Sequence, residues 1–233
     1  MTWIAQPHNN PVFAHLVSLV PALNTQTGPW IAGGSARKLK QNLPFETGDV
    51  DVFFANDAQR LAWTHQFEST LSYDHTQPSR THSVDVIFSS HLITYDTITP
   101  TPCYRTERPY CYKKLETDNA DTYCVHFEFG GKIYDLDMQL IKTRYSPTLI
   151  NLWRDFDFTI SCFAADAERV YHTEQAVCDL DRNLIVLNNA GLKRNLALRV
   201  IKHHIYGFEV PPELLIQASQ LIAHGEYEWN EIY

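Results

Sequence analysis

The feature that most constrains the fold of this sequence is a pair of β-rich segments, residues 123–129 and 132–141, joined by Gly130-Gly131. Two glycines between such segments favour a primed turn, because both central residues of that turn need a positive φ. The pattern therefore predicts an antiparallel hairpin. The 12% aromatic residues disfavour low-complexity disorder and supply much of the area that a core can bury.

Local signals place several other elements. Asn10-Pro11 predicts the start of a core helix, because Asn is a good N-cap and Pro suits the first helical position. Residues 49–54 and 83–88 predict strands, and Asn56 and Asp57 predict the cap of a helix over about 57–70. The polar segment 99–120 reads as a loop or an insertion.

The chain changes character after Ser146-Pro147, and the remaining residues are predicted to be mostly helical. One helix is expected over 192–206, ending at Gly207, and another from Pro211 to near Gly225. The sequence thus divides into a mixed α/β part, residues 1–145, and a helical part, residues 146–233. Whether these parts are two domains or one body stays open at this point.

Composition excludes several classes of protein. With 19 basic and 27 acidic residues the formal net charge is −8, which argues against long non-specific contact with a nucleic-acid backbone. The sequence contains no run of 18 apolar residues, so no membrane span is predicted. The first eleven residues lack the pattern of a signal peptide. Five cysteines without framework spacing favour a reduced, cytoplasmic protein. The sequence does not indicate an oligomeric state.

Two carboxylates share one face of the predicted strand at 49–54. Asp49 and Asp51 lie two residues apart, hence about 7 Å along a strand, and would repel each other. Simple solvent exposure is one explanation. A divalent cation is the other, since Mg²⁺ usually binds one or two carboxylates together with phosphate oxygens and water.

A glycine turn precedes this strand by fifteen residues. Gly33 and Gly34 let a backbone approach a phosphate closely, and the next helix would present N–H groups to an anion. Ser35 adds a hydroxyl donor, and Arg37 or Lys38 adds positive charge. An ordinary strand–turn–helix connection explains the same residues, but together with the carboxylates they predict a nucleoside triphosphate (NTP) on the turn and its metal on the strand.

A third acidic segment lies in the second hairpin strand, where Asp135, Asp137 and Gln139 share one face. A carboxylate there would complete a two-ion site. One ion would activate an acceptor hydroxyl, and the other would hold the triphosphate and stabilise the leaving pyrophosphate.

The order of Gly33-Gly34-Ser35, Gly48-Asp49-Val50-Asp51-Val52 and a later strand carboxylate resembles the polymerase-β-like nucleotidyltransferase superfamily. Weaker matches at 118–120, 156–160 and 199–208 resemble its compact branch, often encoded by phages or viruses. The resemblance covers about residues 30–210 and implies an α+β fold, with a short mixed β-sheet and flanking helices before the helical part. The Arg-Arg-Asp and Glu-Asp-x-x-Arg motifs of CCA-adding enzymes are missing from the sequence, which counts against CCA addition.

The resemblance implies that Asp49, Asp51 and Asp137 are the catalytic metal ligands of a two-ion Mg²⁺ site, with Mn²⁺ as an alternative ion. Asp135 is the rival for the third position, and Asp85 is a more distant one. The implied function is transfer of a nucleoside monophosphate (NMP) from an NTP to an acceptor hydroxyl, with a tRNA-like RNA 3′ end as the expected acceptor. A second-messenger synthase, a protein nucleotidylyltransferase and a catalytically silent binding protein or inhibitor are the alternatives.

The helical part offers further candidates. Asn195, Arg199, Lys202 and Tyr206 fall at helical spacing and form one polar stripe on the predicted 192–206 helix. Either this stripe is a solvated face, or Arg199 and Lys202 close over the triphosphate. Asp157 would contribute to the nucleotide site, cap a helix or hold a basic residue.

Two weaker patterns fall around the 99–120 segment. Its aromatic and basic residues either clamp single-stranded nucleic acid or reflect ordinary loop composition. A zinc site is disfavoured, because the cysteines and the histidine concerned lack a short Cys-x2–4-Cys spacing. The residues of this zinc reading are Cys103, Cys111, Cys124 and His126.

Overall fold

The computed structural model describes residues 3–73, 80–81, 108–189 and 196–223. The predicted strand at 83–88, with Asp85, lies outside these residues, as do Cys103 and the stripe residue Asn195. Among the described residues, none of the helices is both long enough and apolar enough to span a membrane.

A nine-stranded mixed sheet organises the described residues, in the order β1-β9-β8-β2-β3-β7-β6-β5-β4. Parallel pairs join β3 to β7 and β4 to β5, and the other neighbours are antiparallel. The strands are β1 (Trp3–Pro7), β2 (Trp30–Ala32), β3 (Val50–Phe54), β4 (Arg80–Thr81), β5 (Tyr110–Glu116), β6 (Ala120–Phe129), β7 (Lys132–Tyr145), β8 (Phe163–Ala165) and β9 (Arg169–Thr173).

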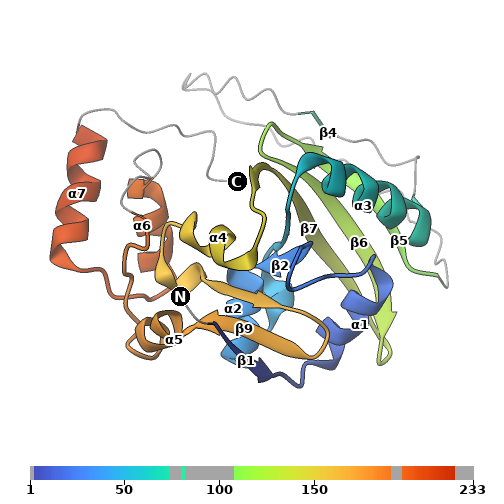
Figure 1. Cartoon of the computed structure of the whole chain (residues 1–233), viewed down its shortest axis with the longest axis horizontal. Helices are drawn as coiled ribbons and strands as arrows, with labels where there is room; N and C mark the ends of the chain where they lie inside the picture. The colour runs from blue at the N-terminus through green and yellow to red at the C-terminus, as the bar shows by residue number, and fades with distance from the viewer. Residues whose placement is uncertain (1–2, 74–79, 82–107, 190–195, 224–233) are drawn as a thin grey trace, which may run out of the picture.

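Seven α-helices surround the sheet in the described part of the chain (Figure 1). They are α1 (Pro11–Leu19), α2 (Gly34–Lys40), α3 (Asp57–Thr70), α4 (Leu149–Arg154), α5 (Glu174–Asp181), α6 (Leu196–Ile205) and α7 (Pro212–Ala223). Two short 3-10 helices cover Phe45–Thr47 and Thr159–Ser161. The last two helices, α6 and α7, pack against each other on the side of the molecule away from β5 (Figure 1).

The elements with strong local signals form where the sequence predicts them. Asn10 caps α1 by accepting from the N–H of Phe13, and Asn56 caps α3 by accepting from the N–H of Gln59. Gly130 and Gly131 both have positive φ, at 60° and 76°, and they join β6 to β7 as the predicted hairpin. Each signal acts over only a few residues, so the rest of the fold does not alter it.

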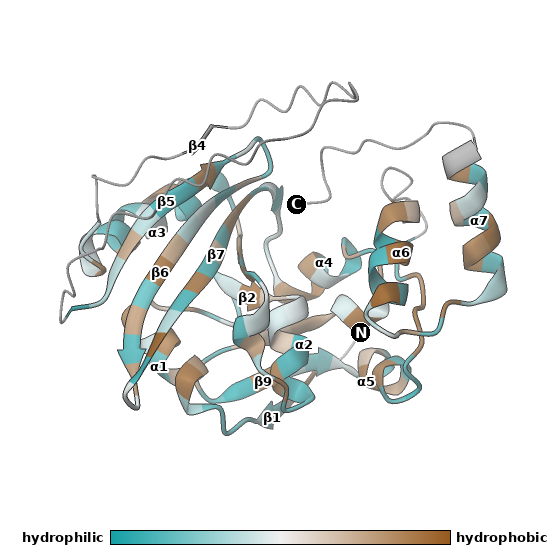
Figure 2. Ribbon diagram, turned by 180° about the vertical axis from the view of Figure 1, so that it is seen from behind, coloured by the Kyte–Doolittle hydropathy of each residue, from teal (hydrophilic) through white to brown (hydrophobic). Residues whose placement is uncertain are grey.

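The two faces of the β5–β7 region differ. On one face α1 and α3 cover aromatic residues, since His15 contacts Phe127 and Phe67 contacts Tyr123. The other face carries Asp135 and alternate polar positions, and Figure 2 shows that no described helix crosses it. Alternation along β7 therefore points its carboxylates away from the main aromatic core.

The expected fold class is wrong in two respects. The sheet is large rather than short, with nine strands among the described residues. Moreover, β8 and β9 come from the part that was predicted to be helical, and they pair with β2 and β1. Strands of three to five residues give little periodic signal, and their partners lie far away in the sequence. The division at residue 145 stays a prediction.

Candidate functional site

The glycine turn lies directly against the acidic strand. Gly33 links β2 to α2 with a φ of +87°, and a Cβ added there would lie 3.6 Å from Asp51 Oδ2. Only glycine adopts this backbone conformation without strain. A Cβ added at Gly34 would meet nothing within 4 Å, so Gly34 borders open space. The turn and the strand thus meet at one place, with room beside them.

Register identifies the third carboxylate. In the parallel pair of β3 and β7, Val50 lies opposite Met138, so Asp49, the residue before β3, comes next to Asp137, the residue before Met138. These two carboxylates interact electrostatically, whereas Asp135 binds the Nδ1 of His126 at 2.7 Å. The structure therefore brings together Asp49, Asp51 and Asp137, and it leaves the rival Asp135 outside this group.

The two aspartates at the start of β3 are held in an unfavourable state as anions. Partial removal from water, followed by the charge of Asp137, raises the pKa of Asp49. Burial, followed by the charge of Asp49, raises the pKa of Asp51 to about 7. Desolvation and like charges both disfavour ionised carboxylates, and side chains perturbed in this way are concentrated at functional sites.

Basic side chains gather around these carboxylates. Each of them lowers the pKa of at least one of the two aspartates, and they come from α2, β5, β7 and α6. They are Lys38, Lys114, Arg144, Arg199 and Lys202. Five cations at one place in a chain of net charge −8 make this site locally suited to a polyanion.

The two neighbouring basic residues of α2 have different environments. Lys38 acts on Asp49 and donates to Thr47 Oγ1 at 2.8 Å. Arg37 is buried, donates to the carbonyl oxygen of Ile160 at 3.3 Å and lies over the ring of Phe208. Burial lowers the pKa of Arg37 to about 10. Of the two alternatives, Lys38 rather than Arg37 lies where it acts on the acidic strand.

Ser35 is in place beside the turn with an unused hydroxyl. Its side chain is buried, and its Oγ has no hydrogen-bond partner among the described residues. A buried hydroxyl without a partner costs about 1–3 kcal/mol. Water or a ligand would remove this cost, so the orphaned hydroxyl marks a polar position that the described protein groups do not fill.

The helix α6 brings two residues of the predicted stripe, Arg199 and Lys202, to the site. Lys202 lowers the pKa of both Asp49 and Asp51. Arg199 forms an ion pair with the buried Asp157 and also acts on Asp51. Of the roles considered for Asp157, the structure thus shows the one of holding a basic residue, and this contact ties α6 to the segment before β8.

A metal ion fits the two aspartates around β3 better than it fits all three carboxylates. Among residues 3–73, 80–81, 108–189 and 196–223, no group of three or more acidic, His or Cys side chains is arranged to hold a metal. Asp137 Oδ2 instead accepts from Lys114 Nζ at 2.6 Å. Asp49 and Asp51 remain, and two carboxylates with phosphate oxygens are a usual Mg²⁺ set.

Two of the basic residues at the site, Lys114 and Arg144, were not expected there from the sequence. Lys114 belongs to a segment read as a loop, but residues 110–116 form β5 and bring it to β7. Arg144 lies at the end of β7, where it acts on Asp51 and lies over the ring of Phe156. The local sequence does not predict a site role for either residue, because strand pairing with segments distant in the sequence brings each of them to the site.

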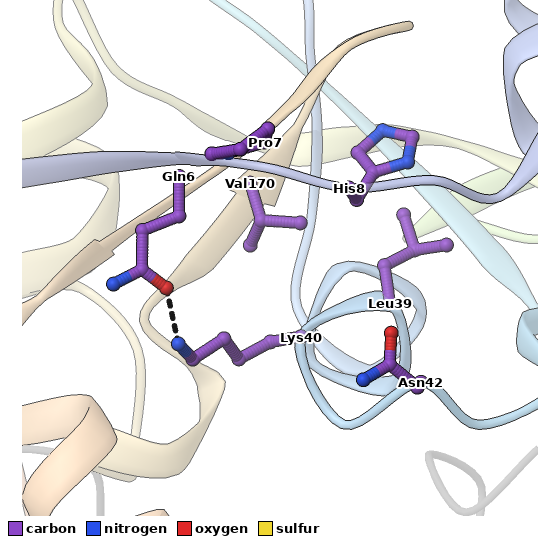
Figure 3. Close-up of a pocket in the computed structure, with 7 residues that line it drawn as sticks. All are labelled: Gln6, Pro7, His8, Leu39, Lys40, Asn42 and Val170. Atoms are coloured by element: carbon purple, nitrogen blue, oxygen red, sulfur yellow. Dashed lines mark hydrogen bonds between the residues drawn. The ribbon is translucent and has the colours of Figure 1, made fainter.

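A separate cavity of about 200 Å³ lies at the other end of α2 (Figure 3). Lys40 donates to Gln6 across it, and no acidic side chain lines it. Its lining residues are Gln6, Pro7, His8, Leu39, Lys40, Asn42 and Val170. Because α2 separates this cavity from the glycine turn, it is not part of the acidic site.

Comparison with known proteins identifies the family. The family model described as Gad2, Gabija anti-defense 2 family protein, matches residues 9–183 of this chain of 233. No match was found among curated proteins. The chain belongs to the Gabija anti-defense 2 family. This finding overturns the assignment to the polymerase-β-like nucleotidyltransferase superfamily, which rested on short motifs that an unrelated chain can also carry.

Proposed function

We propose that this protein counteracts Gabija defence, as the name of its family states, and that its partner is a Gabija protein. The matched residues 9–183 contain the glycine turn, the three carboxylates and Asp157. They do not reach α6, which supplies Arg199 and Lys202. The part of the chain that the family defines therefore includes the acidic centre of the candidate site.

The first experiment tests this function in cells. Bacteria that carry a Gabija system are challenged with a phage that the system restricts, with and without this protein. We expect plaque numbers to rise toward those of cells without the system. Unchanged plaque numbers, with the protein present at a level confirmed by immunoblot, would remove the anti-defence proposal.

We further propose that the acidic site binds an NTP with a divalent cation and transfers its NMP to an acceptor hydroxyl. The observation that carries this proposal is the set of five basic side chains around a pair of carboxylates with raised pKa values. Asp49 and Asp51 lie on one face of the strand and raise the free energy of the site as anions, and a bound cation would remove this cost. A divalent cation would relieve the carboxylate repulsion, and a polyphosphate would give the basic side chains an anionic partner.

The roles of the residues come from their positions. Gly34 borders the open space beside the turn and lets a phosphate approach the backbone, and Ser35 offers its unused hydroxyl. Asp49 and Asp51 would hold Mg²⁺ or Mn²⁺, which supplies charge stabilisation at the phosphates. Lys38 and Lys202 would bind phosphate oxygens, one from α2 and the other from α6.

The proposed reaction forms a bond between the acceptor oxygen and the α-phosphorus and breaks the bond from that phosphorus to the bridging oxygen. Pyrophosphate leaves, and the proton of the acceptor hydroxyl passes to Asp137. The cations around the site stabilise the charge that develops on the leaving pyrophosphate, and positioning supplies most of the acceleration.

The acceptor distinguishes three versions of this proposal. An RNA 3′ end is the acceptor expected from the sequence, a second nucleotide would make a messenger, and the family favours a hydroxyl of a Gabija protein. The protein is incubated with each α-³²P-labelled NTP, Mg²⁺ and, separately, purified Gabija proteins, RNA or no acceptor. Label that migrates with a Gabija protein supports the third version, and label in RNA or in a small product supports one of the others.

One pair of variants connects the labelling assay with the cell assay. Asp49→Asn with Asp51→Asn removes both charges while keeping size, and Asp57→Asn at the start of α3 is the matched control. Loss of labelling and of protection only in the double variant supports transfer. Full protection by the double variant shows instead a catalytically silent inhibitor that acts by binding.

A further inference from the structure

Lys114 lies among the carboxylates of the site although it comes from a strand two positions away from β7 in the sheet. Its Nζ donates to Asp137 Oδ2 at 2.6 Å. It also interacts with Asp49, since each of the two residues affects the pKa of the other. One ammonium group thus acts on two of the three carboxylates.

A β-bulge points Lys114 at this place. In the pairing of β5 with β6, Lys113 lies opposite Tyr123 and Leu115 lies opposite Thr122, so Lys114 is the extra residue between them. Bulges redirect side chains and recur next to active sites. Lys113 interacts instead with Glu116 and Asp121, so the two neighbouring lysines serve different carboxylate groups.

The side chain of Lys114 reaches Asp137 across the strand β6, which lies between β5 and β7. Cys124 of β6 lies directly opposite Asp137 of β7 and is small and buried. Lys114 extends over this position while about half of its side chain stays exposed. An exposed ion pair contributes little to stability, so stabilising the sheet does not explain the bulge.

We propose that the Lys114 ammonium partly neutralises Asp49 and Asp137 before a ligand binds, and that it moves to the phosphates when a cation on Asp49 and Asp51 binds together with an NTP. This inference rests on the proposed nucleotide site. Its consequence is coupling: a cation alone meets the repulsion of the Lys114 ammonium beside Asp49, whereas an NTP gives Lys114 a new anionic partner away from Asp49. By linkage, cation and nucleotide then increase each other's affinity equally.

The test measures binding of Mn²⁺ by its electron paramagnetic resonance signal, without any catalytic readout. Full-length wild type, Lys114→Met and the matched control Lys113→Met are titrated with Mn²⁺, alone and with a non-hydrolysable NTP analogue. We expect Lys114→Met to bind Mn²⁺ alone about tenfold more tightly than wild type, and to lose most of the enhancement by the analogue. Lys113→Met should behave as wild type does.

The possible results separate this inference from the function on which it rests. Equal Mn²⁺ affinity of Lys114→Met and wild type, abolished in both by Asp51→Asn, would overturn the role of Lys114 and leave the metal site intact. No Mn²⁺ binding by any variant, even with the analogue, would overturn the nucleotide site itself. Lys114→Gln keeps a donor without the charge and should behave as Lys114→Met does, and thermal melting of each variant confirms that the compared proteins are folded.

Discussion

Two groups of carboxylates occupy different parts of the molecule, and their environments are opposite. Around α3 and the far ends of β5 and β6, Asp57, Glu116 and Asp121 each have basic partners within ion-pair distance. Around β3, Asp49 and Asp51 act on one another, and the cations of the described residues act on them from further away. Direct contact neutralises the first group but not the second.

The pKa values of Asp57 and Glu116 move in the direction opposite to those of Asp49 and Asp51. Hydrogen bonds from Tyr145 and Arg60 lower the pKa of Asp57, and those from Lys113 and Lys142 lower the pKa of Glu116. Burial and neighbouring charge raise the pKa of Asp49 and of Asp51. Direct pairing neutralises a carboxylate within the protein, whereas two carboxylates that repel each other are a cost that a ligand can remove. The comparison separates carboxylates that the protein itself neutralises from carboxylates that it leaves for a ligand.

The largest expected effect is on transfer. Asp51→Asn should lower the initial rate of label transfer about 10³-fold, because it removes a cation ligand beside the α-phosphate. Asp57→Asn should leave the rate within about twofold, since its partners Arg60 and Tyr145 lie outside the acidic site. Rates are measured with saturating Mg²⁺ and NTP. Similar losses in both variants would contradict the separation of the two groups.

The second prediction concerns stability and its dependence on pH. Because the pKa of Asp51 is raised from 3.8 to about 7, ionisation of Asp51 destabilises the folded state progressively between these two pH values. The full difference corresponds to at most about 4 kcal/mol, and we expect Asp51→Asn to recover roughly 1–3 kcal/mol at pH 8.

Urea unfolding of wild type and Asp51→Asn at about pH 4 and about pH 8 measures this difference. Folding raises the pKa of this acid, so the protonated form is favoured on folding. The penalty is therefore absent below the unfolded pKa of 3.8 and complete above the folded pKa of about 7. The two proteins should have similar unfolding free energies at the lower pH. A variant that is less stable than wild type at the higher pH would show that Asp51 has a direct partner in solution.

The third prediction tests the paired group. Arg60 donates to Asp57, Tyr145 and the buried Asp121. Arg60→Met keeps the aliphatic stem and removes these bonds, so we expect a loss of about 1–2 kcal/mol in the free energy of unfolding. Lys142 still neutralises Asp121 at 2.6 Å, which limits the loss. Transfer and Mn²⁺ binding should be unchanged, and a large change in either would link the two groups.

The parts of this architecture that depend on neighbouring residues were predictable from the sequence. The caps at Asn10 and Asn56 and the Gly130-Gly131 hairpin are each defined within a few residues, and all three are confirmed. The size of the sheet was not predictable in this way. At its edge β1 pairs with β9, where Trp3 lies opposite Thr173, and no local pattern specifies such a distant partner.

The candidate site shows the same division. Asp49, Asp51 and the glycine turn were found from their spacing, because strand alternation places two such carboxylates on one face. The sequence resemblance already favoured Asp137 over Asp135, and the parallel register of β3 and β7 places Asp137 beside Asp49. The bulge was needed to bring in Lys114. When strand pairing brings a residue to a site, the sequence that flanks this residue does not predict its role.

The smallest expected effect separates the two glycines of the turn, where folding and ligand binding meet. Gly33→Ala forces alanine to a φ of +87° and should cost about 1–2 kcal/mol of unfolding free energy. Gly34→Ala places a methyl group in open space at the start of α2, where alanine is the better helix former, so stability should stay equal or rise by about 0.5 kcal/mol.

Gly34→Ala nevertheless fills the space in which a phosphate would approach the turn. We expect it to weaken binding of the NTP analogue about fivefold while the protein melts at or above the temperature of wild type. Calorimetric titration of the analogue with Mg²⁺ measures the affinity, and Gly131→Ala in the distant hairpin turn is the control for a glycine substitution without contact to the site. Unchanged analogue affinity in Gly34→Ala would mean that the phosphates do not lie against the turn. The basic residues of α6, Arg199 and Lys202, would then be the groups that bind them.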